Sequence, residues 1–261
     1  MKDSLVSIIM PTYNWKEKWI SLAIDSVLSQ SYSDVELIII NDASTNNVEK
    51  TILSYMQKDK RIIYLKNDEN KERSISKNRW ILASIWKYVA FLDDDDIWTD
   101  PTKLEKQIHF LEKNIEYWLC WCSVHIINEY WVLENKVSMR ETDKEIREHL
   151  LQFNQLAQSA IVIRKDIFAF SWLFLNTWTF SEDAELWLRI GKYTKLYNLQ
   201  NTYIEYRNRL DNTSNRNKIK LQWYGFIAMC MHGKNYPNLI KSFVLRLWLI
   251  VLTIFWYKYK A

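Results

Sequence analysis

The first half of the chain alternates short apolar runs with longer segments of helical periodicity, and this alternation restricts the fold more than any other feature. The apolar runs predict strands at 6–10, 36–40, 61–65 and 88–92. Helices are expected between them, at 16–28, 46–58 and 74–84, the second with Ser44 or Thr45 as its N-cap. Because strands and helices follow one another in this order, we expect an α/β fold with a mostly parallel central sheet and right-handed crossovers.

Polar residues follow three of these four strands, where sheets of this kind bind their ligands. These segments are Pro11-Thr12-Tyr13-Asn14, Asn41-Asp42 and the four aspartates Asp93, Asp94, Asp95 and Asp96. Four consecutive carboxylates repel one another unless a cation or ligand neutralises them. Oxygen ligands suit Mg²⁺ or Mn²⁺, which usually also bind water and phosphate. The sequence therefore predicts a divalent metal and a phosphate-bearing substrate at this edge, with a solvated acidic turn as the alternative.

The second half has a different rhythm and a strongly apolar end. We expect a helix at 102–114, a hairpin of 119–127 and 132–137, a helix at 143–151, a strand at 159–164, a helix at 182–193, a strand at 202–206 and a polar loop at 208–217. The run 243–257 is interrupted by Arg246 and followed by Lys258 and Lys260. It is shorter than the roughly 20 residues of a spanning helix. Two interpretations remain: an interfacial helix that makes peripheral membrane contact, or a helix that packs on the core.

Glycine and tryptophan occur in unusual numbers. The chain has 3 glycines and 14 tryptophans, whereas average usage of about 7% predicts roughly 18 glycines. Several tryptophans stand in turn contexts, where a residue without a Cβ atom is favoured. We hypothesise that a UGA codon read as glycine in the source organism underlies seven of them: Trp15, Trp80, Trp86, Trp121, Trp131, Trp172 and Trp178. Trp98 and Trp187 are expected to be genuine, and the alternative is a protein naturally rich in tryptophan.

Charge and cysteine content exclude some functions. The formal net charge of +4 is too small to indicate a nucleic-acid partner. Cys120, Cys122 and Cys230 lack the second pair that a four-ligand zinc site needs, so reduced thiols are expected. The apolar run at 6–10 has strand length and no cleavage site after it, which argues against a signal peptide. We expect a cytoplasmic protein, with the inner face of the cytoplasmic membrane as one location.

Four segments together resemble the successive motifs of family 2 glycosyltransferases, in order and in spacing, over about residues 4–210. They are MPTYNW, IIINDAST, SKNRWILASIWKYVAFLDDDDIW and SEDAELWLRI. The resemblance implies a Rossmann-like GT-A fold with helices on both faces of the sheet. We expect a catalytic domain at 1–215, with a nucleotide-sugar-binding half (1–115) and an acceptor-binding half (116–215), and a C-terminal helical tail at 216–261.

The resemblance also implies roles for individual residues near the donor. Pro11, Thr12, Tyr13 and Asn14 match the lining of the nucleotide pocket, and Asp42 matches the acid that contacts the base. Lys77 and Asn78 match an Arg-Asn pair near the diphosphate, although lysine lacks the two-pronged geometry of arginine. Asp93 and Asp95 match the ends of an Asp-x-Asp motif. We expect Asp95 to bind the metal directly, Asp93 and Asp94 to hold ribose, metal or metal-bound water, and Asp96 to cap the next segment.

Glu182 and Asp183 match a Glu-Asp pair in which the aspartate is the catalytic base. Inversion by direct displacement needs one carboxylate to accept the proton of the acceptor hydroxyl. Asp183, at a predicted helix N-terminus, is expected to stay ionised with the help of the helix dipole. An ordinary pair of acids at a helix start is the alternative.

The predicted function is the transfer of a sugar, with inversion, from a nucleotide-diphospho-sugar, usually a UDP-sugar, to an acceptor hydroxyl. The acceptor is a saccharide or a lipid-linked saccharide of cell-envelope polysaccharide or glycolipid synthesis. A degenerate module that only binds nucleotide sugars is the non-catalytic alternative. A nucleotidyltransferase would need a glycine-rich phosphate loop, and a phosphatase with an aspartate nucleophile would leave PTYN and Glu182-Asp183 unexplained.

Overall fold

The parallel half of the sheet agrees with the sequence prediction to within two residues at each boundary. The structure is a computed structural model that describes residues 5–71, 73–84, 86–137, 139–178, 180–209 and 212–260. Its first elements are β1 (Val6–Thr12), α1 (Glu17–Leu28), β2 (Val35–Asn41), α2 (Val48–Lys58), β3 (Ile62–Lys66), α3 (Arg73–Ala83) and β4 (Tyr88–Phe91). The four strands pair in parallel in the order β3-β2-β1-β4.

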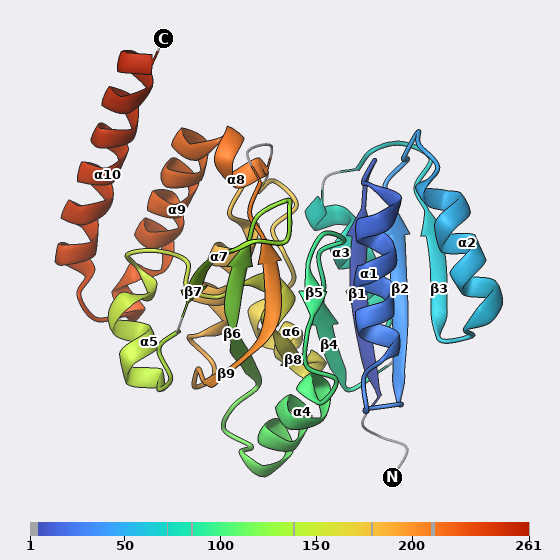
Figure 1. The fold of residues 1–261 in the computed structure, drawn as a ribbon. Coiled ribbons are helices and arrows are strands. Elements are labelled where there is room, and N and C mark those ends of the chain that lie inside the picture. The colour runs from blue at the N-terminus through green and yellow to red at the C-terminus, as the bar shows by residue number, and fades with distance from the viewer. Residues whose placement is uncertain are drawn as a thin grey trace.

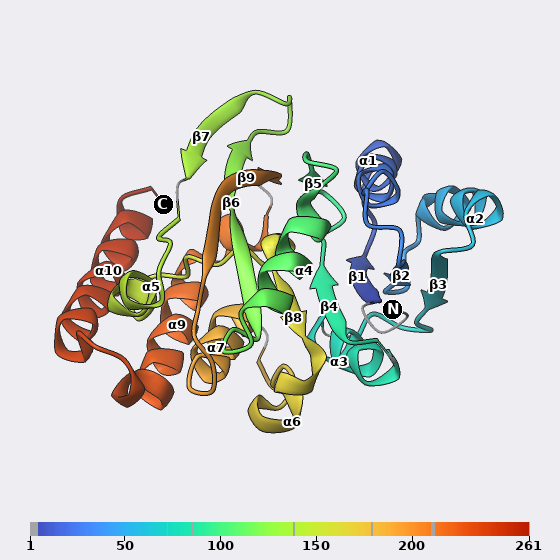
Figure 2. The same cartoon turned by 90° about the horizontal axis from the view of Figure 1, so that it is seen from below.

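Helices cover both faces of this half, as expected (Figures 1 and 2). Helices α1 and α2 lie on one face and α3 on the other. Residues of β1 such as Ile8, Ile9 and Met10 are fully buried, as strands covered on both faces should be. In α1 the expected apolar positions, among them Ile20 and Ile24, face this core.

The second half makes the sheet mixed, whereas a mostly parallel sheet was predicted. Strand β8 runs antiparallel to β4, and the order continues through β6 and β9 to β5, with β7 beside β6. The elements are β5 (Ile97–Trp98), α4 (Lys103–Lys113), β6 (Leu119–Ile127), β7 (Leu133–Val137), α5 (Asp143–Leu150), η1 (Gln158–Ala160), β8 (Val162–Arg164), η2 (Lys165–Ile167), α6 (Phe168–Ser171), α7 (Glu182–Ile190) and β9 (Asn198–Arg207). The predicted hairpin is confirmed, but the strand expected at 159–164 begins with the 3₁₀ turn η1.

The C-terminal part contains the predicted helical tail. Its elements are α8 (Thr213–Arg216), α9 (Lys218–His232), η3 (Gly233–Asn235) and α10 (Leu239–Lys260); α9 and α10 lie in the helical tail expected at 216–261, whereas α8 lies in the expected polar loop. Helix α10 packs against α9, and the buried Nε of Arg246 donates to the carbonyl of Leu151 at 2.6 Å. Within the described residues, no helix combines the length and the apolar character needed to cross a bilayer.

The suspected tryptophans have two unusual properties. Trp131 and Trp172 have φ of 68° and 63°, in the left-handed region that side chains with a Cβ atom rarely adopt. Four others have buried indole N–H groups without a hydrogen-bond partner among the described residues: Trp80, Trp86, Trp121 and Trp178. Trp98, predicted to be genuine, donates its indole N–H to the carbonyl of Ser159 at 2.9 Å. Trp187 does not follow this distinction, since its indole N–H is also buried and unpaired within the described residues.

Candidate active site

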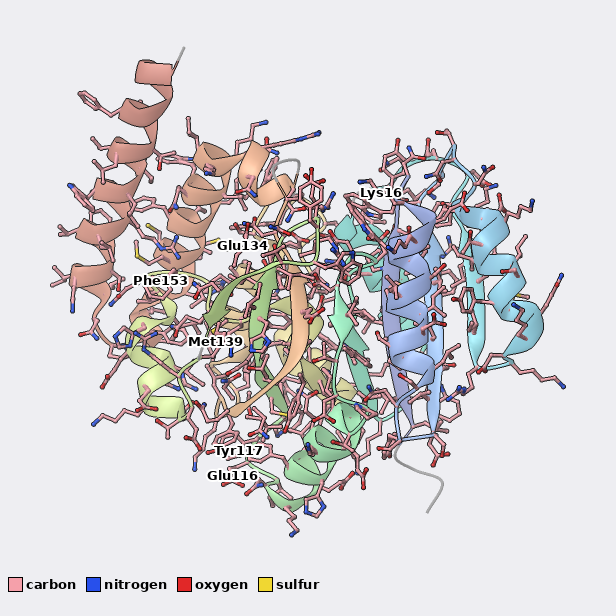
Figure 3. All side chains as sticks on the ribbon, viewed as in Figure 1. Lys16, Glu116, Tyr117, Glu134, Met139 and Phe153 are labelled. Carbon is pink, nitrogen blue, oxygen red and sulfur yellow. The ribbon has the colours of Figure 1, made fainter. Side chains whose placement is uncertain are left out.

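The polar segments after β1 and β2 lie together at the carboxyl edge of the sheet. The side-chain oxygen of Asn14 accepts a hydrogen bond from the backbone N–H of Thr45 at 2.7 Å. The hydroxyl of Ser44 accepts from the backbone N–H of Asn14 at 2.9 Å. These contacts replace the predicted capping role of Ser44 and Thr45, because α2 begins later, after Asn47. Figure 3 labels Lys16 at this edge and Glu116 and Tyr117 at the opposite one.

Asp42 is held rigidly at this edge by groups that the sequence did not single out. Its Oδ1 accepts from the amide of Asn67 at 2.7 Å and from the backbone N–H of Lys71 at 2.9 Å. Asn67 directly follows β3. The pattern of a polar residue after each strand of the parallel half could therefore have identified it from the sequence. Asp42 is buried except for a small exposed fraction. The hydrogen bonds that Asp42 accepts from the described residues go to Oδ1, which leaves Oδ2 for a ligand in that part of the chain.

The Pro11 to Asn14 segment combines buried and exposed residues. Thr12 is buried, and its Oγ1 has no hydrogen-bond partner within the described part of the chain. Tyr13 is exposed. A buried hydroxyl without a partner beside an exposed aromatic ring suits a surface that is completed by a ligand.

The four aspartates after β4 divide into two pairs. Asp94 and Asp96 are buried, whereas Asp93 and Asp95 keep part of their surface exposed. Asp96 does not cap the next segment as predicted: it accepts from the hydroxyl of Ser159 at 2.5 Å and from the backbone N–H of Arg207 at 3.0 Å. Burial, with the neighbouring aspartates, raises the pKa of Asp96 well above its usual range. Asp96 therefore links β4 to η1 and β9.

Asp95 is paired with an arginine that sequence reasoning missed. Its Oδ2 lies 2.7 Å from Nη2 of Arg209, and its backbone carbonyl accepts from Nε of Arg207 at 3.0 Å. Burial first, and then the charge of Asp93, raise the pKa of Asp95 to about 6, although Arg209 opposes this. The guanidinium of Arg209 also lies 3.9 Å from the ring centre of Trp15. Arg207 is the last residue of β9 and Arg209 lies in the polar stretch after it, but nothing in the sequence there indicated where they point.

The aspartate edge is the part of the sheet's carboxyl edge that carries Asp93, Asp94, Asp95 and Asp96. It fits a divalent cation whose coordination shell is completed by other ligands. Asp93 and Asp95 offer carboxylate oxygens, which Mg²⁺ and Mn²⁺ prefer. No cluster of three or more acidic, histidine or cysteine side chains suited to a metal occurs among the residues that the structure describes. Asp93 and Asp95 would by themselves supply only part of a coordination shell. Mg²⁺ is commonly held in this way, by one or two carboxylates, water and substrate phosphates.

Lys77 connects the aspartate edge with the predicted catalytic pair. Its Nζ lies 3.1 Å from Oε1 of Glu182 and donates to Oε1 of Gln158 at 2.9 Å, in a side chain only 2% exposed. Gln158 is adjacent in η1 to Ser159, whose Oγ also accepts from the backbone N–H of Asp93 at 3.0 Å. The two predicted clusters are thus joined through η1. Because Nζ of Lys77 already contacts Glu182 and Gln158, it would have to share its N–H groups between these residues and a bound diphosphate.

Asp183 is oriented by two donors. Its Oδ2 accepts from the amide of Asn154 at 2.8 Å and its Oδ1 from the backbone N–H of Ala184 at 2.8 Å. The carboxylate keeps some exposed surface although protein surrounds it densely. Burial first, and then the charge of Glu182, raise the pKa of Asp183 to about 6. With a pKa of about 6 the carboxyl group is still mostly ionised at neutral pH, as expected, and this value suits a general base.

Asn78 holds a loop instead of facing the aspartates. Its amide donates to the carbonyl of Phe174 at 2.7 Å and to Oδ1 of Asn176 at 2.8 Å, and its oxygen accepts from the backbone N–H of Phe174 at 2.9 Å. Asn78 also lines a cavity of about 1050 Å³ whose walls include Trp86 and Trp172. None of the aspartates after β4 lines this cavity, and neither does Asp183.

Comparisons with known proteins agree on one family. A model of "Glycosyl transferase family 2" matches residues 7–171. An uncharacterized glycosyltransferase of Methanocaldococcus jannaschii is 32% identical over 240 residues, which are 90% of this chain and 81% of that protein. The UDP-Glc:α-D-GlcNAc-diphosphoundecaprenol β-1,3-glucosyltransferase WfgD of Escherichia coli is 33% identical over 228 residues, 85% of each chain.

Solved structures support the same fold. S. aureus TarS 1–349 in complex with UDP-GlcNAc superposes with a TM-score of 0.72 at 15% identity, covering 93% of this chain and 72% of that one. Mannosyltransferase PcManGT from Pyrobaculum calidifontis, in complex with GDP-Man and Mn²⁺, gives 0.71 at 12% identity, covering 95% and 72%. The chain belongs to glycosyltransferase family 2, and it is a nucleotide-sugar-dependent enzyme with the GT-A fold.

Proposed function

We propose that the enzyme transfers a sugar, with inversion, from a UDP-sugar to a hydroxyl of a lipid-linked saccharide in cell-envelope polysaccharide or glycolipid synthesis. The observation that carries the inverting mechanism is the carboxylate of Asp183, oriented by Asn154 and Ala184 and joined through Glu182, Lys77 and η1 to the aspartate edge. UDP and the lipid-linked acceptor are supported by the activity of WfgD and by the TarS complexes.

The chemical step requires one proton acceptor. As the acceptor oxygen forms its bond to the anomeric carbon, the bond from that carbon to the diphosphate oxygen breaks, and the nucleoside diphosphate leaves. Asp183 takes the hydroxyl proton during this attack. Its two hydrogen bonds restrict the carboxylate to one orientation. Glu182 keeps the ion pair with Lys77 and adds negative charge that raises the basicity of Asp183.

Donor binding is assigned to the edge formed by β1, β2 and β4. Asp42, fixed by Asn67, accepts from the N–H of the base, and Asp93 and Asp95 hold the cation. The cation, when bound, neutralises charge on the departing diphosphate. Arg209 forms an ion pair with Asp95, and a guanidinium in this place also suits a phosphate oxygen.

Two carboxylate variants test this assignment. Asp183→Asn should bind UDP-sugar in the presence of Mn²⁺ as the wild type does, while the transfer rate falls by about 10²- to 10⁴-fold. Asp95→Ala should instead lose the Mn²⁺-dependent part of donor binding. Calorimetry with UDP measures binding, and release of UDP measures turnover. Full turnover by Asp183→Asn would exclude it as the base, and unchanged Mn²⁺-dependent binding by Asp95→Ala would exclude it as a metal ligand.

The seven suspected tryptophans bear on whether this chain, as translated here, is active. We propose that Trp15, Trp80, Trp86, Trp121, Trp131, Trp172 and Trp178 are glycine in the natural protein. The left-handed backbone of Trp131 and Trp172 supports this, as do the unpaired indoles of four others within the described residues. Genuine tryptophans would favour the degenerate donor-binding alternative, because Trp15 stacks on Arg209 beside Asp95.

The coding DNA tests the glycine proposal directly. UGA is expected at the seven suspected codons and UGG at Trp98 and Trp187. Peptide mass spectrometry on protein isolated from the source organism should find glycine at the seven positions. UGG codons at Trp131 and Trp172 would refute the proposal, whatever the other codons are.

A further inference from the structure

Helix α10 has one face that packs on the protein and another that is covered by nothing in the structure (Figure 1). On the inner face Ser242, Arg246 and Ile250 are buried. On the outer face apolar side chains are exposed at intervals of three and four residues, which places them on one side of the helix. This outer stripe consists of Ile240, Val244, Leu247, Val251 and Ile254.

The outer stripe is too long and too regular to be a chance set of exposed residues. It extends for about 21 Å along the helix at 1.5 Å per residue. Ile240 is 82% exposed, Val244 61% and Val251 53%. A contiguous apolar surface of this kind usually marks a site of interaction. The stripe contains no tryptophan, so it is independent of the glycine proposal.

Charge is segregated onto the same part of the chain. From residue 212 to the end there are eight Lys and Arg and no Asp or Glu. The preceding residues therefore hold 27 of the 35 basic and all 31 of the acidic residues. The segment that carries α9 and α10 thus has a formal charge of +8, and the rest of the chain has −4. Lys220, Lys234 and Lys241 are exposed in this basic segment.

We propose that the outer stripe docks α10 onto the anionic surface of a lipid bilayer, with the helix lying in the interfacial plane. Apolar side chains enter the boundary between headgroups and acyl chains, and neighbouring lysines attract anionic headgroups. A second copy of this chain is the less favourable occupant. It would bring two segments of +8 together with no carboxylate between them. Of the two interpretations of the tail, packing on the core is confirmed for the inner face, and interfacial docking is the proposal for the outer face.

The direction of α10 suits this role. In Figure 1 the C-terminal end of α10 rises on the side where β1 ends, and Figure 3 shows Lys16 on that side as well. With α10 in the interfacial plane, the strands would run roughly along the bilayer surface, so the carboxyl edge of the sheet would open beside the bilayer. A lipid-linked acceptor would then reach the site without leaving the membrane; this last point alone rests on the proposed function.

Vesicle flotation with the full chain tests the proposal. Wild type should bind vesicles of phosphatidylcholine mixed with phosphatidylglycerol far better than vesicles of phosphatidylcholine alone, and higher salt should weaken binding. Val244→Glu combined with Val251→Glu should lower the partition coefficient by about tenfold or more. Ile115→Glu is the matched control, because Ile115 is 79% exposed but lies outside the stripe. Lys234→Gln and Lys241→Gln should each weaken binding by about fivefold.

Melting temperature and UDP release in solution show whether each variant is folded and active. Equal vesicle binding by wild type and the double glutamate variant would overturn the proposal, as would the absence of wild-type binding to either vesicle. A wild-type dimer that the double variant abolishes, with no vesicle binding, would identify a second copy as the occupant. If the wild type releases UDP but does not bind vesicles, only the docking proposal is refuted. If it binds vesicles but does not release UDP, only the proposed function is refuted.

Discussion

Replacement of Trp172 by glycine should stabilise the protein, and the structure gives the size of the effect. Trp172 has φ 63° and ψ 172°, a region that glycine alone adopts readily. A residue with a Cβ atom is held there at a cost of about 1–3 kcal/mol. The indole is 76% exposed, so its removal loses little burial. The greater freedom of glycine in the unfolded chain offsets about 0.5–1 kcal/mol of the gain.

The net expectation is a gain of roughly 1 kcal/mol in the free energy of unfolding, or about 2–4 °C in Tm. Urea denaturation and thermal melting measure both quantities. Trp172→Ala keeps a Cβ atom and should not stabilise. Trp98→Gly should lose about 3–5 kcal/mol, because Trp98 is 3% exposed and its indole is hydrogen-bonded. A Trp172→Gly variant that melts below both the wild type and Trp172→Ala would refute the backbone argument.

Three further predictions concern the site. Burial raises the pKa of Asp183 to about 6, and only its ionised form accepts a proton. The transfer rate should therefore rise with pH through about 6 and level off above it. Initial rates that do not change across that range would contradict this prediction. Lys77→Met leaves Glu182 without its buried cation and should lower the free energy of unfolding by about 3–5 kcal/mol. Lys66→Met, in an exposed pair with Glu49, should change it by less than about 1 kcal/mol. Urea denaturation compares the two variants. Asn67→Ala removes a donor from Asp42 and should weaken UDP binding by about tenfold. Calorimetry measures this against Asn201→Ala, a control at an exposed position in β9.

Local pattern was sufficient for the parallel half of the fold. Each strand there is an apolar run buried on both faces, and each crossover is a helix with one apolar face, so both elements are visible in the sequence itself. The positions of Asp42 and of the aspartates after β4 followed from strand order, because carboxyl ends of parallel strands meet at one edge. The order of the family motifs then placed Glu182 and Asp183 near that edge.

The remaining features depend on contacts between distant segments. Strand β5 has only two residues, too few to show any periodicity. Arg209 and Asn154 stand in polar stretches that look like ordinary loops, and only the fold brings them to Asp95 and Asp183. Asp183 was expected to stay ionised at a helix start, and the burial that raises its pKa to about 6 cannot be read from a sequence in which its neighbours are polar.

The hydroxyl of Ser159 has a consequence for how such enzymes diversify. It joins Asp93 and Asp96 of one half to η1 of the other, and Arg207 adds a second connection to Asp96. A chimera that exchanged the part after residue 115 for that of a relative would succeed only if the incoming part carried an equivalent serine and arginine. Change in the part after residue 115 is therefore expected to be tolerated in the loops around this connection more readily than as an exchange of the whole part.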